Sequence, residues 1–396
     1  MIRPESLESD IAATSRIRAS GSFRLTHIDE YAFTMDFWLA TVAQSKARGY
    51  DGTRNGQHRK SRMRRFIRFV AISLGVLLAL CAAGVIVGTL VTDYQYERSV
   101  KSISKKLATV AVSSPQIVWD TDLHPYGFPE GDFDSPYLDY TAPSTVAISG
   151  SVAAVTFQKS NYAGNQLVQD IHLVTLSIKD GAVLKNTQWP RQGPLGLSPG
   201  IFCCTKNNEF YAYNDGWLLI KNGEVIGIQK TNPVGPNTQQ IKVTLGNSKR
   251  PTTIEIAHED GSKSTLQTDC GLVHTSFLSK DRFVMIGCNV SSVIGTDGHI
   301  LFSDSFADEG LKGLHFGGRT SDGSKFVISV TSYRPGDPAS LTDEWLVIYD
   351  TEKQRAAFAL KSGPLPYQQS QTALSADGKY LLVGSGGHVE LVDIRE

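Results

Sequence analysis

The segment that most restricts the fold of this chain is the apolar run from Phe69 to Val91. Its 23 residues contain no ionisable side chain apart from Cys81. A helix of this length spans roughly 34 Å, enough to cross a hydrocarbon core of about 30 Å. In hydrocarbon a single segment satisfies its backbone polar groups only as a helix. A buried core helix is the alternative, but such helices rarely run so far without a polar face. We therefore expect one transmembrane helix.

The charges that flank this run predict its orientation. The first acidic residues after it are Asp93 and Glu97. Under the positive-inside rule, a basic upstream flank keeps the N-terminus cytoplasmic and places the C-terminal domain in the periplasm or outside the cell. Lipid headgroups are favoured over nucleic acid as the contact of this flank, because it adjoins the span. The basic flank consists of Arg59, Lys60, Arg62, Arg64, Arg65 and Arg68.

The net charge of zero results from two unlike parts of the chain. Residues 1–68 carry 13 Lys and Arg against 7 Asp and Glu, a net charge of +6. Residues 69–396 carry 26 against 32, a net charge of −6. Such asymmetry is typical of contact with a membrane or a polyanion, and here it changes sign at the span.

A cleaved secretory signal is the alternative to a retained anchor. Met63, Arg64 and Arg65 would form the basic start of a signal if translation began there, and Ala82-Ala83-Gly84 offers small residues for cleavage. Signal cores are about 7 to 15 residues long, which is shorter than this run. The length therefore favours a retained anchor.

The composition divides the chain into four parts. Residues 1–62 are polar and predict a cytoplasmic tail that is partly disordered, and residues 63–92 hold the basic flank and the transmembrane helix. Residues 93–111 predict a juxtamembrane stalk. From residue 112 to 396, short β-branched runs alternate with turn dipeptides, which is typical of an all-β domain.

A short motif recurs along this last part. A serine precedes a turn with Asp or Gly and then an apolar strand, as in Ser279-Lys280-Asp281-Arg282, Ser321-Asp322-Gly323-Ser324-Lys325 and Ser375-Ala376-Asp377-Gly378-Lys379. The second half of each unit holds two strands joined by a tight turn, in most units Asp-Gly or Asn-Gly, which are strong hairpin signals. Four short strands every 40–50 residues or so predict β-propeller blades.

These features resemble those of the WD-repeat and quinoprotein-like β-propeller superfamily. The resemblance lies in the Ser-x-Asp-Gly-Lys turn and in the strand endings Val347-Ile348-Tyr349-Asp350 and Leu391-Val392-Asp393, and it covers roughly residues 112–396. The Gly-His pair of true WD repeats is missing from its expected place, and Gly298-His299 and Gly387-His388 fall in hairpin turns instead. The resemblance implies a degenerate propeller fold and no particular function.

The length of this domain predicts the number of blades. At about 42 residues per blade, the stretch from Val112 to Glu396 corresponds to about seven four-stranded blades, with six or eight as alternatives. The last unit ends at Ile394 after three strands. We expect an N-terminal segment such as Gln116–Trp119 to supply the fourth strand and close the ring, which would remove the open sheet edges.

An aromatic and acidic stretch near the start of the domain is the candidate interaction loop. Asp-x-Asp pairs can bind Ca²⁺, but a complete series of loop ligands is missing from the sequence, so neither a metal ion nor a cofactor is expected. A connecting loop that contacts a partner is the favoured interpretation. Its residues are Trp119, Asp120, Asp122, His124, Tyr126, Asp132, Asp134 and Tyr137.

Four cysteines follow the span. Cys270 ends one hairpin and Cys288 ends a strand of the next unit, so these two are the candidate disulfide pair. Cys203 and Cys204 are adjacent and would point to opposite faces of a strand, as small buried residues. The even number is compatible with an oxidising compartment.

No catalytic set is recognisable in the sequence, which favours a binding protein over an enzyme. We expect a membrane-tethered extracytoplasmic propeller that acts as a scaffold for a protein or glycan partner. The alternative is a propeller hydrolase or lactonase that uses acidic and His residues along its channel. A buried cluster of three or more such side chains at one channel mouth would favour the enzyme. A one-span sensor ranks lowest, because the tail contains no recognisable signalling domain.

Overall fold

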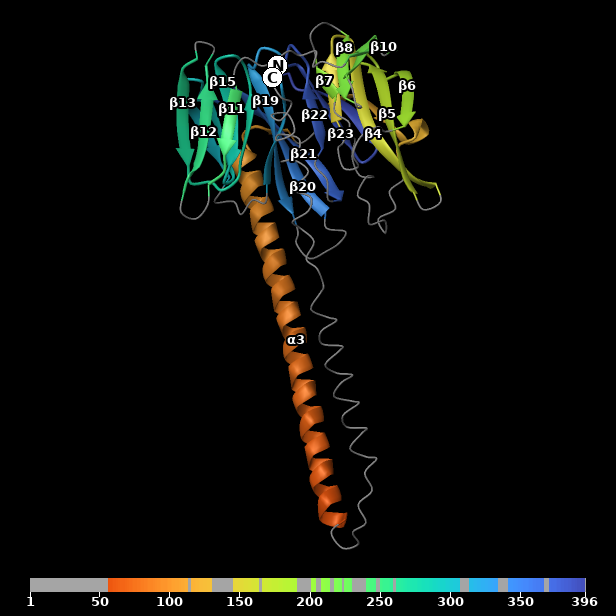
Figure 1. The fold of residues 1–396 in the computed structure, drawn as a ribbon, viewed down its shortest axis with the longest axis vertical. Coiled ribbons are helices and arrows are strands. Elements are labelled where there is room, and N and C mark those ends of the chain that lie inside the picture. Colours follow the sequence, from red (N-terminus) through yellow and green to blue (C-terminus); the bar gives the residue numbers. More distant parts are fainter. Residues whose placement is uncertain are drawn as a thin grey trace. The chain divides into compact units, whose positions relative to one another are not determined.

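Antiparallel strands make up most of the chain after residue 111 in the computed structural model (Figure 1). The residues that the structure describes are 56–112, 115–129, 145–163, 166–190, 201–203, 208–213, 217–222, 224–229, 240–246, 250–258, 261–306, 313–333, 341–366 and 370–395.

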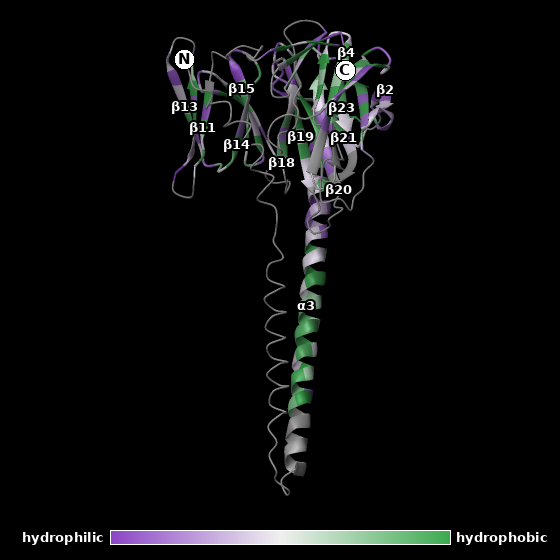
Figure 2. Ribbon diagram, turned by 45° about the vertical axis from the view of Figure 1, so that its right-hand side comes forward, coloured by the Kyte–Doolittle hydropathy of each residue, from purple (hydrophilic) through white to green (hydrophobic). Residues whose placement is uncertain are grey.

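Helix α3 (Gly56–Leu107) contains the expected span. Every side chain from Phe66 to Val91 is exposed, and Figure 2 shows this part of the helix as hydrophobic. Among the described residues it is the one helix long and apolar enough to cross a membrane. A helix that is apolar on all sides needs an apolar surrounding, which lipid provides. Thr89 donates its hydroxyl to the carbonyl of Val85 at 3.0 Å, so this polar group is satisfied within the helix.

The basic flank lies in the first turns of α3. Arg68 is exposed, whereas the side chains of the other five basic residues lie outside the described part of the chain. Their expected contact with lipid headgroups stays a prediction.

The last turns of α3 pack on the sheet that contains β19 (Lys325–Tyr333) and β20 (Leu341–Asp350). Ile103 and Leu107 are fully or almost fully buried in one apolar cluster with Trp345 of β20. The hydroxyl of Tyr96 donates to Asp343, and Ser332 donates to Ser99 at 3.1 Å. This part of the helix is therefore built into the domain.

A short strand continues the attachment beyond the helix. β1 (Ala111–Val112) pairs in parallel with the outer edge of β21 (Arg355–Pro366), where Ala111 lies opposite Ala359. The backbone amide of Ala359 donates to the carbonyl of Val110 at 2.8 Å. Residues 93–111, expected to form a stalk, thus join the sheet at its edge.

The described residues form six sheets. Apart from β1 and β2, the strands that are neighbours in a sheet follow one another in the sequence. The first two sheets consist of β3 (Thr145–Ser149), β4 (Val152–Ala163), β5 (Gln166–Ser177) and β6 (Val183–Pro190), and of β7 (Ile201–Cys203), β8 (Glu209–Tyr213), β9 (Trp217–Lys221) and β10 (Glu224–Gln229). The next two consist of β11 (Gln240–Thr244), β12 (Thr252–Ala257) and β13 (Lys263–Thr268), and of β14 (Val273–Phe277), β15 (Arg282–Gly287), β16 (Val290–Gly295) and β17 (Ile300–Ser305). The last two consist of β18 (Gly313–Arg319) with β19, β20, β21 and β1, and of β22 (Gln371–Leu374), β23 (Tyr380–Ser385), β24 (His388–Asp393) and β2 (Gln116–Asp122).

The first strands of neighbouring sheets adjoin one another. β18 lies beside β22, β22 beside β3, and β3 beside β7, while later strands of each sheet lie successively further out. Apolar clusters fill the spaces between sheets, as where Val327 and Leu346 meet Leu381 and Val392. This arrangement is a β-propeller, so the predicted fold class is confirmed. The described residues contain six sheets, one of them with three described strands, and the expected number of seven blades stays a prediction.

Strand β2 closes the ring, as the sequence predicted. It pairs antiparallel with β24, with Trp119 opposite Leu391, and completes the last sheet. The Trp119 side chain is buried, and its indole nitrogen donates to the carbonyl of Ile178 at 2.8 Å. Gly181 lies against the indole with a φ of +71°, and a Cβ there would be 2.8 Å from Trp119 Cδ2. The turn after β5 therefore requires glycine at this position.

The recurring motif forms the turn between the first two strands of a sheet. Ser375 donates its hydroxyl to Asp377 at 2.7 Å and accepts the amides of Lys379 and Tyr380. Partial burial of the Asp377 carboxyl group raises its pKa. The hydrogen bonds from Ser375 and Lys379 together lower the pKa by more than burial raises it, so the pKa lies below its usual value. In the preceding sheet the hydroxyl in this position belongs to Thr320, which donates to Asp322 at 2.7 Å. This copy of the motif therefore begins at Thr320, one residue before the Ser321 that the sequence pattern predicted.

Replacing Trp119 with Ala should lower the free energy of unfolding by about 3–5 kcal/mol, because a large buried side chain and its hydrogen bond are lost at the ring closure. Urea unfolding of the full chain in detergent, followed by circular dichroism, measures this change. Val118→Ala, at a neighbouring side chain that is 42% exposed, should change the free energy by less than about 0.5 kcal/mol. Equal effects of the two substitutions would contradict the role of Trp119.

Candidate functional site

The candidate interaction loop is divided between the closing strand and a short helix. Trp119, Asp120 and Asp122 belong to β2, and His124 and Tyr126 belong to the 3-10 helix η3 (His124–Tyr126). Asp132, Asp134 and Tyr137 lie outside the described residues. Trp119 is buried in the apolar core between the last and first sheets, so its side chain stabilises the ring and is not part of an exposed surface.

The polar residues of this loop take part in two His–Asp pairs, one within the loop and one with β24 near the end of the chain. Nδ1 of His124 lies 2.6 Å from Oδ1 of Asp122, and the same oxygen accepts the His124 backbone amide at 2.9 Å. Nδ1 of His388, the first residue of β24, lies 3.0 Å from Oδ1 of Asp120. In the ladder between β2 and β24, Asp122 lies opposite His388. The strand register therefore brings together residues that are far apart in the sequence.

Backbone contacts hold the two histidines close to each other. The amide of Leu123 donates to the carbonyl of Gly387 at 2.8 Å, which ties η3 to the turn between β23 and β24. Gly387 has a φ of +82°, and a Cβ there would lie 2.4 Å from His124 Cε1. Only glycine at position 387 permits the His124 ring to lie so close to the backbone. The centres of the His124 and His388 rings are 6.2 Å apart.

The electrostatics of the cluster are those of a partly exposed acidic site. The backbone amide and the ring of His124 donate hydrogen bonds to Asp122 and lower the pKa of its carboxyl group. Glu390, opposite Asp120 in the ladder, has a raised pKa because of burial and the nearby charge of Asp120. The exposed fractions of the Asp122 and His388 side chains are 49% and 46%, so ions and partners in solution can reach them.

This donor set is suited to binding a metal ion. Asp122, His124 and His388 each offer one ligand atom, and these atoms all lie within 4.8 Å of one another. A carboxylate bound to one imidazole nitrogen leaves the other nitrogen with its lone pair, as in many metal sites. No metal ligands were expected from the sequence, and His388 was not among the candidate residues. Its approach to Asp120 depends on the pairing of β2 with β24.

A buried histidine lies beneath the loop. His172 on β5 is 4% exposed and stacks on Phe157 with ring centres 4.8 Å apart. Neither of its ring nitrogens has a hydrogen-bond partner among the described residues. Gly127, which ends η3 with a φ of +99°, lies so close that a Cβ there would be 2.7 Å from His172 Cε1. Burial lowers the pKa of His172, so the ring is neutral at pH 7.

The inner strands do not provide the cluster expected of a propeller hydrolase. The described first strands β3, β7, β14, β18 and β22 contain no carboxylate, and they contribute two histidines, His274 and His315. The His–Asp cluster lies on β24 and β2, the outer strands of its sheet. The observation that would have favoured the enzyme is therefore not met in the described residues.

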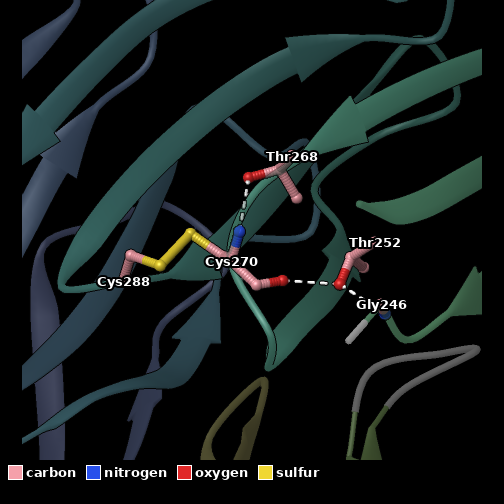
Figure 3. The surroundings of a disulfide bond; sticks show 5 residues. All are labelled: Gly246, Thr252, Thr268, Cys270 and Cys288. Atoms are coloured by element: carbon pink, nitrogen blue, oxygen red, sulfur yellow. Dashed lines mark hydrogen bonds between the residues drawn. A yellow bond between two sulfur atoms is a disulfide. The ribbon is translucent and has the colours of Figure 1, made fainter. Parts of the chain in front are cut away.

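Cys270 and Cys288 form a disulfide, with their Cα atoms 5.5 Å apart (Figure 3). The bond links the end of the sheet β11–β13 to the turn between β15 and β16. Thr252 donates to the carbonyl of Cys270 at 2.5 Å and accepts the amide of Gly246 at 2.9 Å. The expected pair of cysteines thus fastens two neighbouring sheets. Cys203 lies on β7, where its side chain is outside the described residues, as is Cys204.

The solved structures that are similar to this chain share little sequence identity with it. No model of a known protein family matches the chain, and no curated protein matches it. Similar solved structures include the C-terminal WD40 domain of Sif2, with 11% identity, a TM-score of 0.33 and coverage of 72% of this chain and 98% of that chain. A mitotic checkpoint complex structure has 12% identity, a TM-score of 0.31 and coverage of 72% and 95%. Hsv2 of Kluyveromyces lactis has 13% identity, a TM-score of 0.28 and coverage of 72% and 76%. The propeller assignment itself rests on the sheet topology of this chain.

Replacing His172 with Leu should reduce the loss of stability in acid. An unfolded histidine takes up a proton below about pH 6.5, whereas the buried ring resists protonation, so the wild-type chain loses stability as the pH falls through this value. Leu has a similar volume and does not titrate. Urea unfolding at pH 8 and pH 5 should show a smaller difference for His172→Leu than for the wild type. The exposed His299, changed to Leu, serves as control and should leave the difference unchanged. Equal differences for His172→Leu and the wild type would contradict this account.

Proposed function

We propose that the chain is a membrane-tethered extracytoplasmic β-propeller that binds a protein partner through the loops around its ring closure. The observation that carries this proposal is the structural continuity between the anchor and the propeller. A single helix contains the apolar segment, and its last turns are buried in the sheet β18–β21. A propeller joined to such a helix is attached to the membrane that the apolar segment would span.

The attachment is supported by charge as well as by packing. Lys106, near the end of α3, forms an ion pair with Asp304 at 2.8 Å and lies over the ring of Phe306 at 4.1 Å. Asp304 also accepts the hydroxyl of Tyr349 at 2.7 Å. Half-buried ion pairs with additional hydrogen bonds hold a defined geometry better than exposed pairs do. These contacts fasten the last turn of α3 to the propeller.

Two features support a location outside the cytoplasm. The Cys270–Cys288 disulfide persists in oxidising compartments and is reduced in most cytosols. The basic flank precedes the span, and the residues after it carry a net negative charge.

The ring-closure surface is the best-supported place for a partner. It combines the exposed groups of Asp120, Asp122 and His388 with a backbone that is held by the pairing of β2 and β24. A rigid surface loses little conformational entropy on binding. Because the described inner strands contain no carboxylate, we favour binding over the hydrolase or lactonase alternative.

The topology can be tested with reporter fusions in a bacterial host. Alkaline phosphatase fused after Glu396 should be active, and green fluorescent protein at the same position should be dark, because the first folds outside the cytoplasm and the second inside it. Replacing the six basic flank residues with Glu should reduce phosphatase activity by weakening the orientation signal. Fluorescent cells with inactive phosphatase would overturn the proposed orientation.

The partner surface can be tested by site-specific photo-crosslinking in native membranes. A benzophenone amino acid in place of Tyr126 should give one discrete protein adduct, which mass spectrometry identifies. The same amino acid in place of Glu352, an exposed residue in the turn after β20, should not give this adduct. Identical adducts at both positions, no protein adduct at Tyr126, or turnover of ester or glycoside substrates by the purified chain would contradict the proposal.

A further inference from the structure

We propose that Asp122, His124 and His388 bind a divalent transition-metal ion of the Zn²⁺ type, with Asp120 orienting the His388 ring. This metal site goes beyond the proposed binding of a protein partner. It would join β2 and the adjoining helix η3 to β24. The proposal rests on the donor atoms, on their spacing and on the backbone that holds them.

The donor atoms select the class of ion. Two imidazoles and one carboxylate suit Zn²⁺, Ni²⁺, Cu²⁺ and Co²⁺, whereas Ca²⁺ and Mg²⁺ prefer sites made of oxygen ligands. Oδ1 of Asp120 contacts Nδ1 of His388, which leaves Nε2 of that ring as the metal ligand. The Cε1–Nε2 edge of His124 faces Gly387, the residue before His388. Oδ1 of Asp122 lies 2.6 Å from His124 Nδ1, and we assign the second oxygen of this exposed carboxylate as the donor to the ion.

The spacing is close to that of a metal site. One donor atom from each of the three residues lies within 4.8 Å of the others. In a tetrahedral Zn²⁺ site with bonds of about 2.0–2.2 Å, the ligand atoms are roughly 3.3–3.6 Å apart. A pair of donor atoms at this limit must therefore close by about 1.2–1.5 Å, which rotations of partly exposed side chains allow without a change in the backbone.

The backbone around the site is held in place from both sides. Leu123 donates to Gly387, and the antiparallel ladder fixes Asp122 opposite His388. The positive φ of Gly387 and its contact with His124 leave no room for a side chain at this position. Three protein ligands give an open site, in which water or a donor from a partner supplies the fourth position. Bound metal would link the two chain segments that close the ring.

The direct test is metal binding by the full chain, purified in detergent with a tag that lacks histidine and stripped with a chelator. Isothermal titration with Zn²⁺ should show one equivalent bound by the wild type. Co²⁺ should give visible d–d bands of a nitrogen and oxygen site without the thiolate charge-transfer bands that cysteine ligands produce. His124→Ala and His388→Ala should each weaken Zn²⁺ binding at least tenfold.

The chain offers a matched control in His299, which also follows a hairpin glycine and is exposed. His299→Ala should bind Zn²⁺ as the wild type does. Asp122→Asn keeps the shape of the side chain and should also weaken Zn²⁺ binding. In the presence of a chelator, all variants should have the same melting temperature as the wild type, because they differ only in the metal site. Absence of stoichiometric Zn²⁺ binding, thiolate bands with Co²⁺, binding of Ca²⁺ in place of Zn²⁺, or equal affinity of His388→Ala and the wild type would each overturn the proposal.

Discussion

The pairing of β2 with β24 is the contact on which the rest of the domain depends. A sheet edge carries unpaired backbone donors and acceptors, and β22–β24 alone would leave one such edge open. β2 satisfies it, and Trp119 on the same strand fills the space against the turn at Gly181. The same ladder sets Asp122 opposite His388, so the candidate metal ligands exist as a group only because the ring is closed.

Much of the architecture could be predicted from local sequence patterns. The apolar run, the hairpin dipeptides and the recurring turn each depend on residues close together in the chain, and so do the turns at Gly181, Gly298 and Gly378, all of which have positive φ. The missing strand of the last unit was predictable because three strands leave an edge that needs a partner. One copy of the recurring turn was expected to begin at Ser321 but begins at Thr320. The pattern required serine, whereas the hydroxyl of threonine makes the same hydrogen bond to Asp322.

The candidate site was predicted only in part, for a physical reason. Asp120, Asp122 and His124 stood out as an acidic and aromatic stretch, and the structure places them at the surface. His388 comes from the other end of the domain, 268 positions after Asp120. The contact between the two side chains depends on the register in which β2 pairs with β24. The burial of Trp119 was likewise not predictable, since an aromatic residue beside acidic ones reads equally well as a surface anchor.

The strands next to the anchor have a consequence for how the chain is assembled. Of the described strands, β1 and β2 are the first to be synthesised, yet they pair with β21 and β24, which are among the last. Neither can find its partner until almost the whole domain has emerged from the ribosome. On the proposal that α3 is anchored in a bilayer, the start of the domain would stay near the point where the remaining chain arrives, and the effective concentration of the waiting strands would be high. On the same proposal, α3 would aid assembly of the domain before it serves as a tether.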